Sequence, residues 1–275
     1  MHTANPDAVA IVTGGASGIG RALCQELATR GAHAVVADIN LAGAREVAAA
    51  IAAGGARASA APLDVADASG VSRLIEETIA AHGRLDYMFN NAGVGVGGEV
   101  RDLTLEHWRR AIETNLWGVI HGTYAAYPAM LRQGFGHIVN IASLAGLIGA
   151  PGLAPYAVTK SGVVALSLAL RAEARDLGVR VSVACPGFVD TAIFEHAIGV
   201  QVDRDEFLAG LPFGLVSAGE AARRILRGVA HNRSLIVFPT YARCLWWLTR
   251  LHPSALTPLQ LRSIRRLRAA LAGER

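Results

Sequence analysis

Tyr156 and Lys160 stand four residues apart in a stretch whose pattern predicts a helix, so both side chains should lie on one helix face. A tyrosine hydroxyl ordinarily titrates at about 10 and is a poor acid or base at neutral pH. A cation held beside its oxygen stabilises the phenolate, by about 1.4 kcal/mol for each unit that the pKa falls. The spacing therefore predicts that Tyr156 moves a proton and that Lys160 supplies the cation.

The composition points to Lys160 independently. Of the 26 basic residues, 25 are arginine and Lys160 is the single lysine. Codon composition alone can produce such a bias, and arginine replaces a surface lysine freely. Arginine does not replace lysine where a compact ammonium on a flexible stem is needed, so Lys160 indicates a site that needs such an ammonium.

A glycine-rich turn, residues 13–20, follows the first predicted strand and precedes a helix pattern that begins at Arg21. Its spacing is Gly-x-x-x-Gly-x-Gly rather than the commoner Gly-x-Gly-x-x-Gly. Such a turn can be merely structural, but between a strand and a helix it lets the backbone approach a pyrophosphate at the helix N-terminus. The candidate contacts are Gly14, Ser17, Gly18, Ile19 and Gly20.

Asp38 ends the second predicted strand, 18 residues after Gly20. A carboxylate there can accept hydrogen bonds from the adenosine ribose hydroxyls and would repel a 2′-phosphate. At position 17 a basic residue could pair with that phosphate, but the residue there is Ser17. Ile39, which follows the aspartate, is not basic either. The cofactor expected is NAD rather than NADP, although an aspartate at a strand end often only caps a helix.

Ser143 closes a predicted strand, 137–143, at the carboxyl edge where a ligand should lie. Its hydroxyl can hold a substrate oxygen. Asn115 lies in Glu-Thr-Asn-Leu, within a predicted helix. Taken singly, a serine at a strand end or an asparagine in a helix is more often structural.

Seven apolar runs separated by helical patterns should position these residues. Continuous apolar strands with intervening helices predict a doubly wound α/β fold, in which a parallel sheet is covered on both faces and binds its ligand at the strands' carboxyl ends. The expected strands are 9–13, 34–37, 58–63, 87–90, 137–141, 179–184 and 235–238.

Six motifs occur in one order and at workable spacing. They are the turn 13–20, Asn90-Asn91-Ala92-Gly93, Asn115, Ser143, Tyr156-x-x-x-Lys160 and Pro186-Gly187. Together they resemble the single-domain short-chain dehydrogenase/reductases, over about residues 7–240. The resemblance implies a Rossmann-type fold with a seven-stranded parallel sheet, hydride transfer with a nicotinamide cofactor, and assembly as a dimer or tetramer.

The same resemblance implies individual roles. Ser143 corresponds to the catalytic serine, and Asn115 to the asparagine that anchors a water-mediated proton path to the lysine. Asp64 should bind the adenine amino group, Asn91 should stabilise the sheet beside it, and Thr191 should touch the carboxamide or phosphates. The remaining cofactor contacts implied are Ala92, Gly93, Pro186 and Gly187, together with Tyr156 and Lys160.

Residues 187–217 form a long insertion between a strand and a helix, and such insertions are often lids. Apolar residues should line the substrate pocket, which favours a secondary alcohol or ketone with a hydrophobic body. They are Val94, Leu144, Leu153, Phe188, Ile193 and Phe194.

Two other classes of function remain as alternatives. An epimerase or dehydratase with tightly retained NAD uses the same Tyr/Lys pair, but its relatives carry a larger C-terminal domain than 35 tail residues can form. A catalytically silent dinucleotide sensor typically loses the Tyr, Lys or Ser, and all three are present.

Positive charge collects in the tail, residues 241–275, which hold seven Arg against one Glu, whereas the first 240 residues carry a net charge of −2. An enzyme that acts on nucleic acid would spread basic residues around its cleft, so we do not expect a nucleic acid as a partner. The tail combines Leu and Trp with Arg in two segments too short to cross a bilayer. We expect it to pack on the domain, 1–240, or on a second subunit; peripheral attachment to an anionic membrane is the alternative.

The polar start and the interrupted apolar stretches predict a cytoplasmic protein. Cys24, Cys185 and Cys244 lack ligand spacing and should be small buried residues, and the nine scattered histidines give no metal site.

Overall fold

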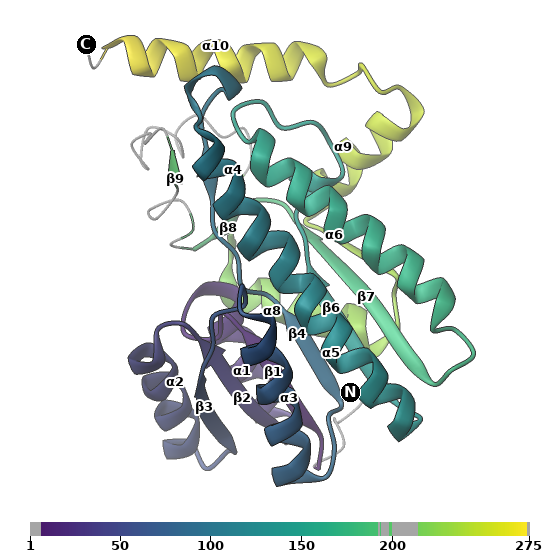
Figure 1. The fold of residues 1–275 in the computed structure, drawn as a ribbon. Coiled ribbons are helices and arrows are strands. Elements are labelled where there is room, and N and C mark those ends of the chain that lie inside the picture. Colours follow the sequence, from purple (N-terminus) through teal and green to yellow (C-terminus); the bar gives the residue numbers. More distant parts are fainter. Residues whose placement is uncertain (1–6, 192, 194–197, 200–213, 274–275) are drawn as a thin grey trace.

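Seven parallel strands form the central sheet of the computed structural model, which describes residues 7–191, 193, 198–199 and 214–273 (Figure 1). The expected Rossmann-type sheet is confirmed. The chain order reverses between the neighbours β1 and β4, which places the switch point of the fold at their carboxyl ends. In sheet order the strands are β11 (Leu235–Phe238), β7 (Val179–Pro186), β6 (Gly136–Ile141), β4 (Tyr87–Asn90), β1 (Val9–Thr13), β2 (His33–Asp38) and β3 (Ala58–Pro62).

Helices cover both faces of this sheet (Figure 1). Alternate residues of β1 enter two separate cores: Ala10 and Val12 pack on one side, Val9 and Ile11 on the other. The first core is closed by α1 (Gly18–Thr29), α2 (Leu41–Ala53) and α8 (Ala218–Ala230). The second is closed by α3 (Ala68–His82), α5 (Gly118–Gln133) and α6 (Ala154–Glu173).

The start of α1 differs from the sequence expectation. The helix begins at Gly18 rather than at Arg21, so the last glycines of the turn already belong to it. Gly18 has a φ of +51°, and a Cβ on Gly20 would lie 2.0 Å from the carbonyl oxygen of Gly14. Glycine disfavours helix on propensity alone, but here the close approach of the turn to the helix requires it.

The structure describes the insertion 187–217 in part, at residues 187–191, 193, 198–199 and 214–217. β8 (Val189–Asp190) pairs in parallel with β10 (Val216–Ser217), and β9 (Ile198–Gly199) pairs with β5 (Val96–Gly97). Residues 192, 194–197 and 200–213 of the expected lid lie outside the described residues.

Two helices follow β11, α9 (Thr240–Leu251) and α10 (Thr257–Gly273), and α10 lies across one end of the molecule (Figure 1). Within the described chain, no helix is both long and apolar enough to cross a membrane. Cys24 and Cys185 are buried as expected, but Cys244 is exposed because it lies on an outward face of α9.

Candidate active site

The four candidate catalytic residues come together at one end of the sheet. Lys160, on α6, is only 3% exposed, and its Nζ donates a hydrogen bond to the carbonyl oxygen of Ile141 at 2.9 Å. The same nitrogen lies 5.6 Å from the ring centre of Tyr156, one helical turn earlier. The end of β6 thus fixes the lysine, and α6 sets the tyrosine beside it.

Ser143 lies just beyond β6 rather than inside it. The strand ends at Ile141, as in the expected range 137–141, so the longer range 137–143, which has Ser143 close the strand, is too long by two residues. Ser143 instead caps a short 3-10 turn, η3 (Leu144–Gly146), where its Oγ accepts a hydrogen bond from the backbone nitrogen of Ala145 at 3.1 Å. The Ser143 hydroxyl can therefore donate a hydrogen bond to a group that lies beside Tyr156.

Burial shifts the titration of this cluster. It raises the pKa of Tyr156 above its ordinary value, and interaction with the Ser143 hydroxyl partly offsets that rise. Burial lowers the pKa of Lys160 to about 8. It raises the pKa of the neighbouring Cys185 thiol to about 12, so Cys185 is a neutral buried group rather than a nucleophile.

Asn115 occupies a π turn, η2 (Glu113–Trp117), between α4 (Leu105–Ile112) and α5. Its fully buried side chain accepts from the backbone nitrogen of Val94 at 2.7 Å and donates to the carbonyl oxygen of Val94 at 2.9 Å. A Cβ on Gly93 would lie 3.1 Å from the Asn115 Oδ1 and 3.5 Å from the Lys160 Nζ. The π turn therefore turns an amide into the site, beside the lysine.

The glycine-rich turn forms a cradle at the N-terminus of α1. Ser17 is the N-cap residue, but no side chain caps the helix. Its first N–H groups can therefore serve a bound anion. Thr191 lies over Gly18, since a Cβ there would meet the Thr191 methyl at 3.1 Å, and Ile19 is half-buried against the core. The expected phosphate contacts are thus adjacent in space.

Asn91 and Thr13 tie β4 to this turn. The Asn91 Nδ2 donates to the carbonyl oxygens of Thr13 and Gly14 at 2.9 and 3.2 Å. The Thr13 Oγ1 accepts from the backbone nitrogens of Asn91 and Ala92, both at 3.0 Å. Thr13 is a supporting residue that the sequence reasoning missed, although its place before the first glycine of the turn marks it.

Asp38 ends β2, and both of its carboxylate oxygens accept backbone hydrogen bonds. The Oδ2 accepts from Ala16 in the turn and the Oδ1 from Asn40, each at 2.9 Å. Asp64 follows β3 and accepts from the backbone nitrogen of Ala66 at 2.9 Å. A surface hollow of about 400 Å³ includes Asp64 and Ile39 in its lining.

The candidate substrate residues have mixed surroundings. Val94 and Leu153 are half-buried, and Leu153 forms a parallel bridge with Gly98, whereas Leu144 is only 7% exposed and offers little surface to a ligand. Phe188 and Ile193 are half-buried, and Phe194 lies outside the described residues.

Tyr241, in the tail helix α9, is a second residue that the sequence reasoning missed. Its hydroxyl accepts a hydrogen bond from the backbone nitrogen of Phe188 at 2.8 Å. A Cβ on Gly187 would lie 2.5 Å from that hydroxyl, which explains a glycine after Pro186. No local pattern in the sequence links this tyrosine to a turn 53 residues earlier.

Metal ligation finds no support in the part of the chain that the structure describes, since no three His, Cys, Asp or Glu side chains there are grouped to hold an ion. The arrangement instead combines a phenol, a buried ammonium, a hydroxyl and a glycine cradle. Such a set can move a proton beside a bound dinucleotide.

Comparison with known proteins agrees with this geometry. Residues 8–198 match the family model described as short chain dehydrogenase. The cyclohexanol dehydrogenase of Acinetobacter sp. (strain SE19) is 38% identical over 198 residues, which cover 70% of this chain and 79% of that protein. The 3-oxoacyl-acyl-carrier-protein reductase FabG of Thermotoga maritima is 29% identical over 229 residues, 83% of this chain and 92% of that protein.

A solved short chain dehydrogenase/reductase from Burkholderia phymatum, in complex with NAD, has a TM-score of 0.82 and 29% identity. The similarity covers 92% of this chain and 95% of that one. With the family model matching well over half of its length, the chain belongs to the short-chain dehydrogenase/reductase family.

Proposed function

We propose that this protein is an NAD-dependent oxidoreductase that interconverts a secondary alcohol and a ketone, with Tyr156 as acid and base. One observation carries the proposal: the buried ammonium of Lys160 lies beside the Tyr156 ring, at the end of the strand that leads to Ser143. The catalytic unit is assigned to residues 1–240, and the tail 241–275 supports it through Tyr241.

The chain's own residues fit a dinucleotide. The turn 13–20 leaves no room for side chains at Gly14 and Gly20, and it ends on an uncapped helix N-terminus that suits a pyrophosphate. Bound NAD supplies a hydride acceptor, and NADH the donor. Asp38 favours NAD because its carboxylate would repel a 2′-phosphate, and the solved relative from B. phymatum was crystallised with NAD.

Three side chains would handle the proton. The Ser143 hydroxyl holds the substrate oxygen, and Tyr156 takes the alcohol proton or returns it to the developing alkoxide. Lys160 stabilises the phenolate by its charge. Asn115 keeps the backbone at Val94 in place beside the ammonium, where a water-mediated path can replace the proton.

The proposed substrate has a hydrophobic body. Val94, Leu153, Phe188 and Ile193, all half-buried, are the apolar side chains offered to it. Two relatives are named for an alicyclic alcohol and for a 3-oxoacyl group. Both names agree with a carbonyl or alcohol carried on an apolar frame.

We also propose a homodimer or homotetramer. Large apolar side chains are exposed on and beside two neighbouring elements of the second core: Trp117 and Tyr124 around α5 are 49% and 80% exposed, and Val158 and Leu168 on α6 are 52% and 42% exposed. A second subunit would cover such a face.

A panel of secondary alcohols and ketones, followed through NADH absorbance, tests the function. NAD should be reduced by at least one apolar secondary alcohol, in a reaction reversed by the ketone. If tightly bound NAD stays with the protein and no alcohol yields free NADH, the epimerase or dehydratase alternative replaces this one. If neither NAD nor NADH binds, the family's cofactor chemistry does not operate here.

A further inference from the structure

The outward face of α9 carries an apolar stripe that no described residue covers. Cys244, Trp247, Leu248 and Leu251 recur at the spacing of a single helix face, and all four are exposed. Trp247 is 55% exposed, Leu248 43% and Leu251 80%. The opposite side of α9 meets the domain through buried Ala242. Packing on the domain, one of the two arrangements expected from the sequence beside packing on a second subunit, therefore accounts for only one of two apolar sides.

Arginine borders this stripe. Arg243 and Arg250 are exposed on α9, and the Arg250 guanidinium lies 5.4 and 5.8 Å from the ring centres of Trp246 and Trp247. No described residue forms an ion pair with either arginine. The positive charges of these two arginines thus lie at the edge of the apolar surface, as in amphipathic helices that bind at a membrane interface.

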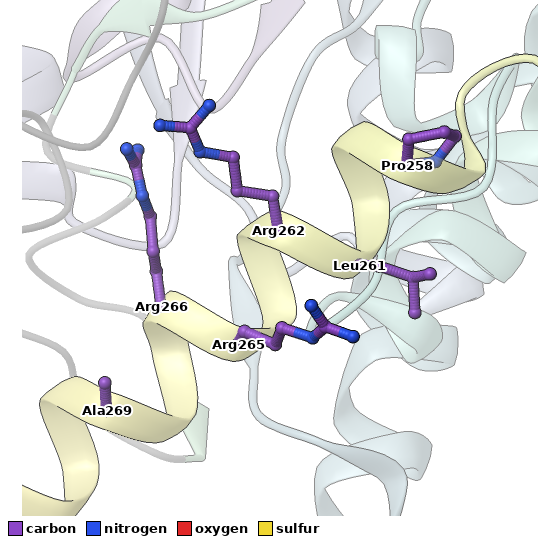
Figure 2. A pocket seen from close by; sticks show the side chains of 6 residues that line it. All are labelled: Pro258, Leu261, Arg262, Arg265, Arg266 and Ala269. Atoms are coloured by element: carbon purple, nitrogen blue, oxygen red, sulfur yellow. The ribbon is translucent and has the colours of Figure 1, made fainter.

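Further arginines lie on α10. Figure 2 shows Arg262 and Arg266 extending in one direction from this helix, while Arg265 points with Leu261 in another. Together with Pro258 and Ala269 these side chains line a hollow of about 610 Å³. Residues 240–273 contain six arginines and no acidic residue. Arg268 pairs with Glu99, with nitrogen–oxygen distances of 2.9 and 2.7 Å.

We propose that α9 and α10 form a docking face for an anionic membrane surface. Exposed tryptophan and leucine beside arginine, on two helices that contain no acidic residue of their own, suit the boundary between acyl chains and negative headgroups. A second copy of the chain is a poorer occupant, because a two-fold contact through this face would bring the same arginines together without a counter-charge. A nucleic acid would use the arginines but would leave the apolar stripe in water.

Two contacts join α10 to segments that flank the candidate active site. The Gln260 Nε2 donates to the carbonyl oxygen of Gly149 at 2.6 Å, in the loop between Ser143 and Tyr156. Arg268 reaches Glu99, five residues beyond Val94. A membrane-bound enzyme would therefore meet an apolar substrate close to the lipid. That consequence rests on the proposed function, whereas the binding itself does not.

Vesicle binding by the full-length protein tests the proposal. Co-sedimentation and tryptophan emission are measured with phosphatidylcholine vesicles, with and without phosphatidylglycerol, at low and high salt. We expect binding to the anionic vesicles, a blue shift of the emission, and release by salt. Equal binding to neutral vesicles, or no binding to anionic ones, overturns the proposal.

Matched variants locate the face. Leu251→Ser should weaken anionic-vesicle binding about tenfold, whereas Leu105→Ser, at an equally exposed leucine on α4, should not. The pair Arg262→Glu/Arg265→Glu should weaken it by at least about tenfold, and the charge-matched pair Arg45→Glu/Arg175→Glu should weaken it less.

Equal losses in the two arginine pairs would mean that binding follows net charge alone. Equal losses in Leu251→Ser and Leu105→Ser would mean that the α9 stripe has no special part in binding. Either result would overturn the assignment to this face. Light scattering without vesicles gives a second readout. A change of oligomeric state in Leu251→Ser would show that the stripe is a contact between copies and would also overturn the proposal. NADH binding by each variant reports whether its dinucleotide fold is intact, independently of the vesicle result.

Discussion

The ammonium of Lys160 lies 5.6 Å from the ring centre of Tyr156 and donates one hydrogen bond to the carbonyl oxygen of Ile141. Its burial lowers its pKa to about 8, whereas burial raises the pKa of Tyr156. The two shifts have one cause, the removal of water from both groups. A compact cation is therefore held in a space of fixed size beside the phenol.

Lys160→Arg should lower turnover at least about 10²-fold, although the charge is kept, because a planar guanidinium cannot occupy the ammonium's buried position. Steady-state kinetics on a responding alcohol measure the loss. The variant's far-ultraviolet circular dichroism controls for folding. Turnover close to that of the unaltered protein would mean that any cation at this position suffices.

Asp38 should govern the choice between NAD and NADP. The unaltered protein should prefer NAD by about 10²-fold or more, since an unrelieved charge clash costs roughly 3 kcal/mol. Asp38→Ser should narrow this ratio of kcat/KM values. Because Asp38 also holds Ala16 and Asn40, the substitution should raise the KM for NAD as well. Equal use of both cofactors by the unaltered protein would refute this role of Asp38.

Gly20→Ala should disrupt the cofactor cradle, because the added Cβ would lie 2.0 Å from the carbonyl oxygen of Gly14. We expect a loss of about 1–3 kcal/mol or more in unfolding free energy and weaker NADH binding. Gly219→Ala, where the added Cβ would meet the Arg223 Nη1 at an ordinary contact distance of 3.5 Å, should change stability by less than about 0.5 kcal/mol. Urea unfolding and NADH fluorescence compare the two, and similar effects would contradict the close approach.

His137 should make stability depend on pH. Burial lowers its pKa from 6.5 to about 3, and its Nε2 contacts the Ser182 Oγ at 2.8 Å. The folded protein keeps the ring neutral while the unfolded chain takes up a proton below its own pKa, so stability is full above pH 6.5 and falls as the pH drops toward 3. Between about pH 7.5 and pH 5 the loss should be roughly 2 kcal/mol. Urea midpoints measure it, and His137→Leu, which cannot take up that proton, should lose this part of the slope.

The sheet could be predicted from the sequence because its strands are buried on both faces. The expected strands 9–13, 87–90 and 235–238 match β1, β4 and β11 to the residue, since an apolar run that is continuous has clear ends. Strands 34–37 and 179–184 extend by one or two residues because polar or proline ends still pair in the ladder. The carboxyl ends of the strands then bring distant motifs together.

The parts that could not be predicted depend on contacts across the chain. The start of α1 at Gly18 reflects the fit against Gly14, not helix propensity. The π turn at Asn115 has no periodic signature, and the bond from the Phe188 nitrogen to the Tyr241 hydroxyl joins the tail to the insertion. The order of the motifs predicts that Asp38 and Asn91 lie near the turn, but it does not predict their partners, the backbone nitrogen of Ala16 and the carbonyl oxygen of Thr13.

Turnover of Tyr156→Phe on a confirmed alcohol or ketone, with NADH binding measured in parallel, decides whether Tyr156 is the acid and base. The phenylalanine keeps the ring and removes only the hydroxyl beside Ser143. We expect turnover to fall by about 10²–10⁴-fold or more, because proton transfer is lost. NADH affinity should stay within about twofold, because the cradle around Gly14, Gly18 and Gly20 is intact. Turnover near that of the unaltered protein, with the same substrate, would contradict the assignment of Tyr156 as the acid and base.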